Sequence, residues 1–198
     1  MNNQLFYKRM NLPPLFYDAT LDKIPNELIY KEVIVRFIKD FKANLIDGRG
    51  LYLWGDYSSG KTALSCILLK SLASIGKMGL FISARDIPKY IIEKVRFDSK
   101  YTFVDRMEMV DLLVIDELIL KEGKDSFVET SVETIFRARL IKKKATIFTS
   151  NNSPSTVKQL FPALYAAMQE AVFPVRVAGK DFRAEKRRQL EKDFEKAK

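Results

Sequence analysis

One eight-residue segment limits the possible folds of this chain more than any other. Residues 55–62 read Gly-Asp-Tyr-Ser-Ser-Gly-Lys-Thr and fit the phosphate-loop pattern G-x-x-x-x-G-K-[ST]. The apolar run 51–54 before it predicts a strand, and residues 61–72 predict a helix. In that setting the glycines let successive backbone N–H groups converge on phosphate oxygens, and the helix N-terminus adds a favourable dipole. The alternative is an ordinary glycine-containing turn between a strand and a helix.

The residues of this loop have separate expected roles. Lys61 is expected to neutralise the β- and γ-phosphates of a nucleoside triphosphate, and the Thr62 hydroxyl is expected to hold Mg²⁺. The expected nucleotide-binding residues are Gly55, Asp56, Tyr57, Ser58, Ser59, Gly60, Lys61, Thr62 and Ala63.

Two further apolar runs end in polar side chains. Residues 111–117 read Asp-Leu-Leu-Val-Ile-Asp-Glu, and residues 146–152 end in Thr-Ser-Asn-Asn. Ligands bind at the carboxyl ends of parallel strands. Asp116 is therefore placed to bind Mg²⁺, Glu117 to polarise an attacking water, and Asn151 to hydrogen-bond the γ-phosphate or that water. The respective alternatives are an exposed acidic strand end and a plain asparagine-rich turn.

Short apolar runs alternate with helical patterns along the rest of the chain. Strands that are apolar throughout indicate a mostly parallel sheet covered on both faces. Residues 1–25, where Pro13 and Pro14 lie among apolar anchors, are expected to form an irregular arm. Strands are predicted at 51–54, 79–83, 110–115, 146–149 and 173–177, and helices at 26–45, 61–72, 86–95, 125–141, 155–172 (with Pro162 as a candidate break) and 180–198.

The composition excludes several classes of chemistry. The 198 residues contain no histidine, which removes His-based general bases, Ser-His-Asp triads and His-containing metal sites. The single cysteine, Cys66, cannot form an intramolecular disulfide and is expected to be a buried core thiol. With no signal-peptide core and no apolar run of membrane-spanning length, a soluble, cytoplasmic protein is expected. The net charge of +9 favours a polyanionic partner such as nucleic acid.

The three polar strand ends, in this order and spacing, resemble the AAA+ division of P-loop ATPases. The closest resemblance is to its DnaC/IstB-type branch of helicase loaders and transposition helper ATPases, and it extends from Asn11 to Arg183. It depends on Leu12-Pro13-Pro14-Leu15-Phe16, Trp54 with residues 55–62, residues 111–118, Arg139 twelve residues before Asn151, Thr149-Ser150-Asn151, and Gly179-Lys180-Asp181-Phe182-Arg183.

This resemblance implies a fold and a set of roles. The fold is an α/β P-loop NTPase of AAA+ type, with a five-stranded parallel sheet in the order 5-1-4-3-2 and little or no separate lid domain. Lys61 and Thr62 match the Walker A residues, Asp116 and Glu117 match Walker B, and Asn151 matches sensor 1. The domain division is an N-terminal arm (1–25), an ATPase domain (26–183) and a charged C-terminal helix (184–198). Family members form rings or spirals on DNA with ATP between neighbours, so a homo-oligomer or a hetero-complex is expected.

One departure from the branch concerns its trans-acting arginine. The stretch that corresponds to the usual element after sensor 1 is residues 163–168, which contain no arginine. An arginine finger can contribute orders of magnitude in rate. Hydrolysis is therefore expected to be slow, or another arginine to serve as finger or sensor; the candidates are Arg137, Arg139, Arg176 and Arg183.

The expected function is ATP binding and hydrolysis in DNA replication, as a helicase loader or remodelling factor with a replicative helicase or another DNA-processing protein as partner. The alternatives are a transposition helper that forms an ATP-dependent filament on DNA, and a nucleotide-gated binding module with little turnover. No Asn-Lys-x-Asp guanine-reading sequence is present, and the Asp-Glu pair favours attack by water over phosphoryl transfer to a metabolite.

A basic segment after the second predicted strand is the candidate DNA contact. Its cations are Lys89, Lys94, Arg96 and Lys100, with Tyr90 and Tyr101 among them as candidate stacking residues. A solvated helix face explains the same residues equally well. Residues 185–198 carry mixed charge, which is typical of a solvated helix. Trp54 is expected to pack on the sheet, with adenine stacking as the alternative.

Overall fold

The computed structural model describes residues 3–25, 28–97, 102–118 and 126–179, and residues 187–188, 191–192 and 194–195 near the C-terminus. Within these residues, no helix is long and apolar enough to cross a membrane. The predicted helix at 180–198 lies largely outside the described residues, so the lid and the C-terminal division of the chain stay predictions.

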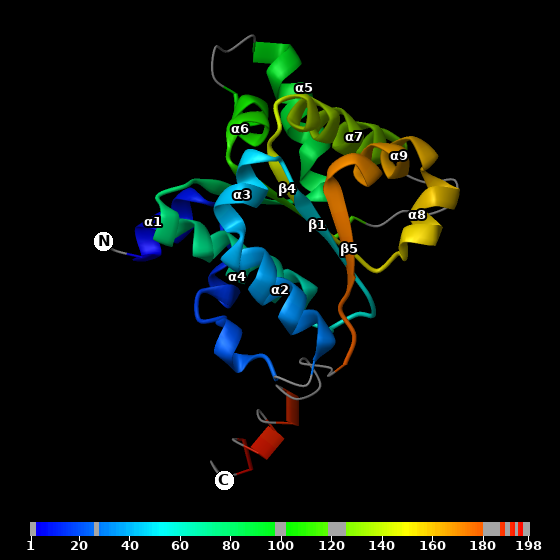
Figure 1. Cartoon of the computed structure of the whole chain (residues 1–198). Helices are drawn as coiled ribbons and strands as arrows, with labels where there is room; N and C mark the ends of the chain where they lie inside the picture. The colour runs from blue at the N-terminus through cyan, green and yellow to red at the C-terminus, as the bar shows by residue number, and fades with distance from the viewer. Residues whose placement is uncertain are drawn as a thin grey trace.

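Five parallel strands form one sheet in the order β2-β3-β4-β1-β5 (Figure 1). The strands are β1 (Gly50–Trp54), β2 (Gly79–Ser83), β3 (Leu112–Asp116), β4 (Ala145–Ser150) and β5 (Val172–Arg176). Leu51 pairs with Ile147 of β4 on one side and with Phe173 of β5 on the other. The order predicted from the resemblance is thereby confirmed, and the strand that precedes the phosphate loop lies between β4 and β5.

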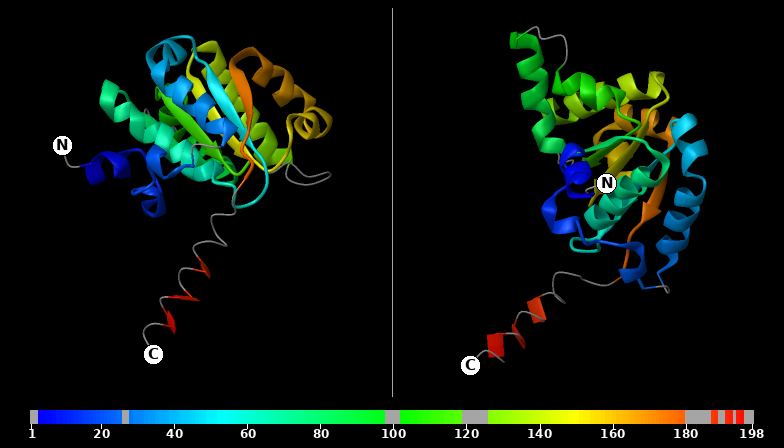
Figure 2. Two further views of the ribbon diagram at one scale, coloured as in Figure 1. Left: turned by 60° about the horizontal axis from the view of Figure 1, so that its bottom comes forward. Right: turned by 90° about the vertical axis from the view of Figure 1, so that its left-hand side faces the viewer.

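Alternate residues of the strands face two separate apolar cores, because side chains alternate between the faces of a sheet. The first core lies under α2 (Ile29–Lys39), α3 (Phe41–Ile46) and α4 (Lys61–Ser71). The second lies under α5 (Ile87–Phe97), α6 (Phe103–Met109), α7 (Ser126–Ile141), α8 (Pro154–Leu160) and α9 (Pro162–Ala171). Figure 2 shows the sheet between these two helical layers.

Several predicted elements differ from those observed. The predicted helix 26–45 is two helices, α2 and α3, which meet at Asp40. The predicted helix 155–172 is interrupted at Phe161 before Pro162, so the candidate break at Pro162 is confirmed. Proline after a residue disfavours its helical conformation, which explains the second break. Helix α6, whose N-terminus is a capping box between Thr102 and Asp105, is not among the elements predicted from the sequence.

The N-terminal arm is more ordered than predicted. It forms α1 (Asn3–Arg9) and two short 3₁₀ turns, Pro14–Phe16 and Leu21–Lys23. Met10 and Leu12 are buried in the first core. The Phe81 N–H donates to the carbonyl of Met10 over 2.8 Å, and the Asn11 side-chain amide donates to the carbonyl of Phe81 over 2.9 Å. These bonds fasten the arm to β2, at one edge of the sheet.

Candidate functional site

The phosphate loop follows β1 in a conformation that requires its glycines. Gly55 has φ +148°, and a Cβ there would lie 2.2 Å from the carbonyl oxygen of Val177. Gly60, which precedes α4, has φ +95° in the left-handed region. The Gly55 N–H donates to the carbonyl of Ser150 over 3.3 Å, so the loop starts against the end of β4. The chain is therefore curled at this point, as the motif predicts.

Lys61 points its ammonium into this curl. Its Nζ donates to the carbonyls of Gly55 over 2.9 Å and Asp56 over 2.6 Å, and the side chain is buried. The ammonium thus lies among the backbone groups that are expected to surround phosphate oxygens. A charged group held at this position favours an anion in the loop.

Asp116 and Thr62 meet at the end of β3. The Thr62 hydroxyl donates to the Asp116 carboxylate over 3.0 Å, across 54 residues of sequence. Burial raises the pKa of Asp116 above its usual value, against the opposing effect of hydrogen bonds from Thr149 and Thr62. A buried carboxylate next to a hydroxyl is an oxygen donor set of the kind Mg²⁺ prefers, so these residues fit the predicted metal.

Glu117 leaves β3 in a left-handed backbone conformation, with φ +56°. Its N–H donates to the Thr149 hydroxyl over 3.0 Å, and that hydroxyl donates to Asp116 over 2.6 Å. The Leu118 N–H donates to the Thr149 carbonyl over 2.8 Å. The end of β4 therefore fixes the path of the chain at Glu117, whose side chain is exposed. The sequence analysis did not assign this role to Thr149.

A cavity of about 290 Å³ lies beside these groups, and Asp116 is linked to it through its hydrogen bond with Thr62. The phosphate loop, Glu117 and Asn151 line it, and so do apolar residues of the N-terminal arm and of helices α2 and α4. The lining residues are Phe16, Ala19, Thr20, Lys23, Ile24, Tyr30, Tyr57, Ser58, Gly60, Lys61, Thr62, Ala63, Leu64, Ile67, Glu117, Thr149, Ser150 and Asn151. Of the predicted nucleotide-binding residues, Gly55, Asp56 and Ser59 belong to the loop without lining the cavity.

The arm and Tyr30 are the part of the cavity that no sequence motif predicts. The apolar run Leu15-Phe16-Tyr17 indicates an anchor for the arm but not a cavity wall. Trp54 does not line the cavity and packs against the second core, which agrees with the predicted sheet packing.

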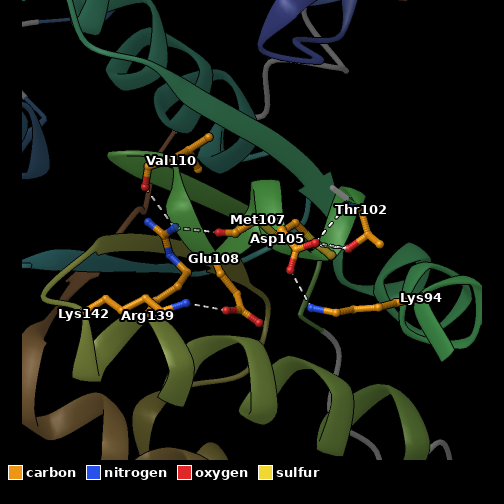
Figure 3. Close-up of polar contacts among 8 residues, drawn as sticks. All are labelled: Lys94, Thr102, Asp105, Met107, Glu108, Val110, Arg139 and Lys142. Atoms are coloured by element: carbon orange, nitrogen blue, oxygen red, sulfur yellow. Dashed lines mark hydrogen bonds and ion pairs between the residues drawn. The ribbon is translucent and has the colours of Figure 1, made fainter. Parts of the chain in front are cut away.

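Arg139 cannot act as an arginine finger or sensor, and this prediction was wrong. The side chain is completely buried, and it donates to the carbonyls of Met107 (2.6 Å), Val110 (3.0 Å) and Ala145 (2.5 Å) and to the Thr146 hydroxyl (3.0 Å). Figure 3 shows the guanidinium at the carbonyls of Met107 and Val110. Burial lowers its pKa to about 9, so it stays protonated at neutral pH. Its role is to hold these backbone segments together.

The other candidate arginines differ in exposure. Arg137 is exposed, with an ion pair to Glu133 at 2.6 Å and a hydrogen bond to the carbonyl of Ala163 at 3.2 Å. Arg176 is exposed at the end of β5, and its guanidinium lies 5.5 Å from the centre of the Trp54 ring. Arg183 lies outside the described residues.

The predicted DNA-contact segment is only partly described. Lys89 pairs with Asp86 at 3.5 Å, and Lys94 pairs with Asp105 at 2.5 Å (Figure 3). Tyr90 stacks on Phe103, with ring centres 4.1 Å apart, so its ring is engaged within the chain and is a poor platform for a base. Lys100, Tyr101 and the side chain of Arg96 lie outside the described residues.

Three features define the class: the sheet order, the curled loop after β1, and the paired acids at the end of β3, which lies one strand away from β1 beyond β4. The chain is a P-loop ATPase domain of the AAA+ type. The chain belongs to the bacterial DnaA ATPase domain family, whose profile matches residues 36–173.

Known relatives agree with this assignment. The replicative helicase loader DnaI of Bacillus subtilis is 25% identical over 182 residues, which are 88% of this chain and 57% of DnaI. A crystal structure of the DnaC helicase loader matches with a TM-score of 0.73 at 20% identity, over 84% of this chain and all of that one. The replication initiator DnaA bound to AMPPCP and single-stranded DNA matches with a TM-score of 0.67 at 18% identity, over 83% of this chain and 51% of that one. The predicted resemblance to this branch of AAA+ proteins is confirmed, and the chain spans little more than half of the DnaI relative.

Proposed function

We propose that this chain binds ATP with Mg²⁺ in the cavity beside the phosphate loop, hydrolyses it, and acts in DNA replication as a helicase loader or remodelling factor. The observation that carries the proposal is the convergence of Lys61, Thr62 and Glu117 on one cavity, with Asp116 hydrogen-bonded to Thr62 beside it, although these residues come from separate elements. Membership of the DnaA ATPase domain family supports ATP as the nucleotide.

Each group has a distinct task in the proposed reaction. The loop N–H groups and Lys61 hold the phosphates, and Glu117 orients a water towards the γ-phosphate while Asn151 contacts that phosphate or the water. Thr62 and Asp116 would hold Mg²⁺, and the bound ion would neutralise negative charge on the phosphates. The rate gain comes from positioning and charge neutralisation rather than from covalent chemistry.

The apolar wall is the proposed place of the nucleoside. Phe16, Ala19 and Ile24 of the arm face the cavity together with Tyr30 of α2. Nucleotide sites combine such apolar surface for the base with a few placed polar groups for the phosphates. The arm is thus proposed to be part of the site, in addition to any role in docking a partner.

The proposal of helicase loading is supported by the similarity to two helicase loaders, DnaI and DnaC. A replicative helicase is therefore the proposed protein partner. DNA is the proposed nucleic-acid partner, supported by the charge of +9 and by the DnaA structure that contains single-stranded DNA. Assembly with ATP between neighbouring subunits is proposed with Arg137, Arg176 or Arg183 as the trans-acting arginine, since Arg139 is buried.

Thermal unfolding with ATP and Mg²⁺ tests the nucleotide site. A ligand at 100 times its Kd stabilises the folded state by about 2.7 kcal/mol, which is roughly 5 to 10 °C for a chain of this size. Lys61→Ala should abolish this shift, and Glu117→Gln should keep it while stopping hydrolysis. An unchanged shift in Lys61→Ala would show that the site is assigned wrongly.

The same variants test the partner. Glu117→Gln loaded with ATP should associate with a hexameric replicative helicase and Lys61→Ala should not, as measured by size-exclusion chromatography. Absence of association and of stimulated loading on DNA would count against a loader. ATP-dependent filaments on duplex DNA in electron micrographs would favour the transposition-helper alternative, and ATP binding without turnover in the presence of DNA would favour the nucleotide-gated module.

A further inference from the structure

The apolar wall of the cavity is held by one lysine of the phosphate-loop helix. Lys70 lies in the last turn of α4. Its Nζ donates to the carbonyls of Phe16 (3.2 Å) and Tyr17 (3.0 Å), and also to the carbonyl of Ala19. An ammonium has three N–H donors, so these three carbonyls use all of them.

Lys70 binds backbone rather than an acidic partner. Within the described residues, no carboxylate lies within ion-pair distance of its ammonium. The face of the Tyr7 ring lies 5.8 Å from Nζ, and burial lowers the pKa of Lys70. Hydrogen bonds from the Lys70 ammonium to backbone carbonyls are charge-assisted, and such bonds are stronger than those between two neutral groups.

The segment that Lys70 gathers has little regular structure to fix its position. Phe16 ends the first 3₁₀ turn, and residues 17–19 belong to the link to the second turn, outside any sheet ladder. The arm is fastened at Met10 and Asn11 to the edge of β2, and Lys70 supplies the next attachment along the chain. Phe16 and Ala19, whose carbonyls Lys70 binds, both line the cavity.

One helix therefore serves both halves of the site. Lys61 begins α4 at the phosphate loop, and Lys70 follows nine residues later, about 13 Å along the helix axis. We infer that Lys70 is a positioning residue for the nucleoside: it holds the 16–19 segment against the cavity and so sets the affinity for the base and ribose, while the phosphate grip is independent of it. This inference rests on the proposed nucleotide site.

Calorimetric titration of two probes tests the inference, ATP and inorganic tripolyphosphate, each with Mg²⁺. Lys70→Met keeps most of the apolar stem and removes the three donors. It should weaken ATP binding about 10-fold or more and change tripolyphosphate binding less than about 2-fold. Lys77→Met is the matched control, because it removes the same charge from an exposed lysine outside the cavity, paired with Asp111 at 3.8 Å. It should leave both affinities unchanged.

If Lys70→Met does not fold, Lys70→Gln replaces it in the titrations. The glutamine amide retains two neutral N–H donors, so the ATP affinity of this variant should lie between those of the wild type and of a variant without donors. Equal ATP affinities in the wild type and the folded Lys70 variants would overturn the inference. A parallel loss of ATP and tripolyphosphate binding would also overturn it, because Lys70 would then act on the phosphate loop. A wild-type protein that binds neither probe would instead contradict the proposed function, on which this inference depends.

Discussion

Thr149 links the Asp116 carboxylate to the backbone of Glu117 through one hydroxyl group. That hydroxyl donates to Asp116 and accepts the N–H of Glu117, whose backbone is in the left-handed region. Non-glycine residues occupy this region at an energetic cost and keep it only where neighbouring groups fix it. Thr149 is therefore a positioning residue for Glu117.

Replacing Thr149 should reduce turnover more than nucleotide binding. Thr149→Val keeps the shape and removes both hydrogen bonds, so kcat for ATP should fall about 10- to 100-fold with KM nearly unchanged, because a small misplacement of a reacting group is costly. Thr149→Ser retains the hydroxyl and should restore most of the rate. Steady-state ATPase assays measure both constants. Wild-type kcat in Thr149→Val would show that Glu117 is oriented by other contacts.

The fold disfavours ionisation of the Cys66 thiol. Burial raises the pKa of the thiol from its ordinary value of 9.0 to about 12. The folded protein therefore carries about 1000-fold less thiolate at pH 8 than the unfolded chain. The predicted buried core thiol is confirmed.

A thiol reagent checks this shift. Because the thiolate is the nucleophile, the folded protein should react with a disulfide reagent at pH 8 at least about 100-fold more slowly than the protein in denaturant. The unfolded state releases the proton first as pH rises, so the contribution of Cys66 to stability is complete below pH 9 and decreases above it. Rapid modification of the folded protein would contradict the burial.

At the scale of elements, Arg139 of α7 joins the C-terminal end of α6 to the start of β4. Its donors satisfy the carbonyls of Met107 and Val110 at the end of α6 (Figure 3) and that of Ala145, the first residue of β4. Two surface ion pairs extend the network, Lys94 with Asp105 and Lys142 with Glu108. Exposed pairs of this kind contribute little, so the buried guanidinium is the part of the network that matters for stability.

Removing the guanidinium should destabilise the fold strongly. Arg139→Met leaves buried carbonyls without donors and should lower the free energy of unfolding by about 3 to 5 kcal/mol, as measured by urea denaturation. Arg137→Met is the control on the same helix: its side chain is half exposed, and its loss should change stability by less than about 1 kcal/mol. Similar effects for the two variants would show that the buried hydrogen bonds contribute little.

Helices and strands could be predicted from the sequence where a repeat of apolar residues and the residues of the following turn lie in one short segment. Leu112–Asp116 and Ala145–Ser150 are strands because they are short apolar runs that end in polar residues. The break at Asp40 and the helix α1 carried no comparable local signal. The arm takes its structure from contacts with β2 and α4, which lie about 70 and 50 residues away along the chain.

At the scale of the whole molecule, the excess positive charge is the feature that bears on DNA. Lys89 and Lys94 already pair with carboxylates, so a DNA phosphate would have to compete with Asp86 and Asp105. The proposed contact of Lys89, Lys94, Arg96 and Lys100 with DNA therefore needs a direct measurement.

Salt dependence provides that measurement. If these four cations neutralise phosphates of single-stranded DNA, affinity should fall about 50-fold between 50 and 200 mM salt. Replacing Lys89 and Lys94 together by alanine should reduce the log–log slope by about 1.4, as measured by fluorescence anisotropy. An unchanged slope would remove these two lysines from the DNA contact, and a flat salt dependence would remove the whole segment.

Local sequence patterns predict the phosphate loop, the acidic end of β3, the polar end of β4 and, through the resemblance they support, the order of the sheet. These features are encoded by residues adjacent in the chain, where glycine freedom, an apolar run and a helix start act locally. Folding of the whole chain, by contrast, makes the N-terminal arm the apolar wall of the cavity, brings Lys70 to that arm and buries Arg139. Those outcomes depend on contacts between distant segments, and the free energy of burying a charge or an apolar side chain depends on neighbours that no local pattern specifies.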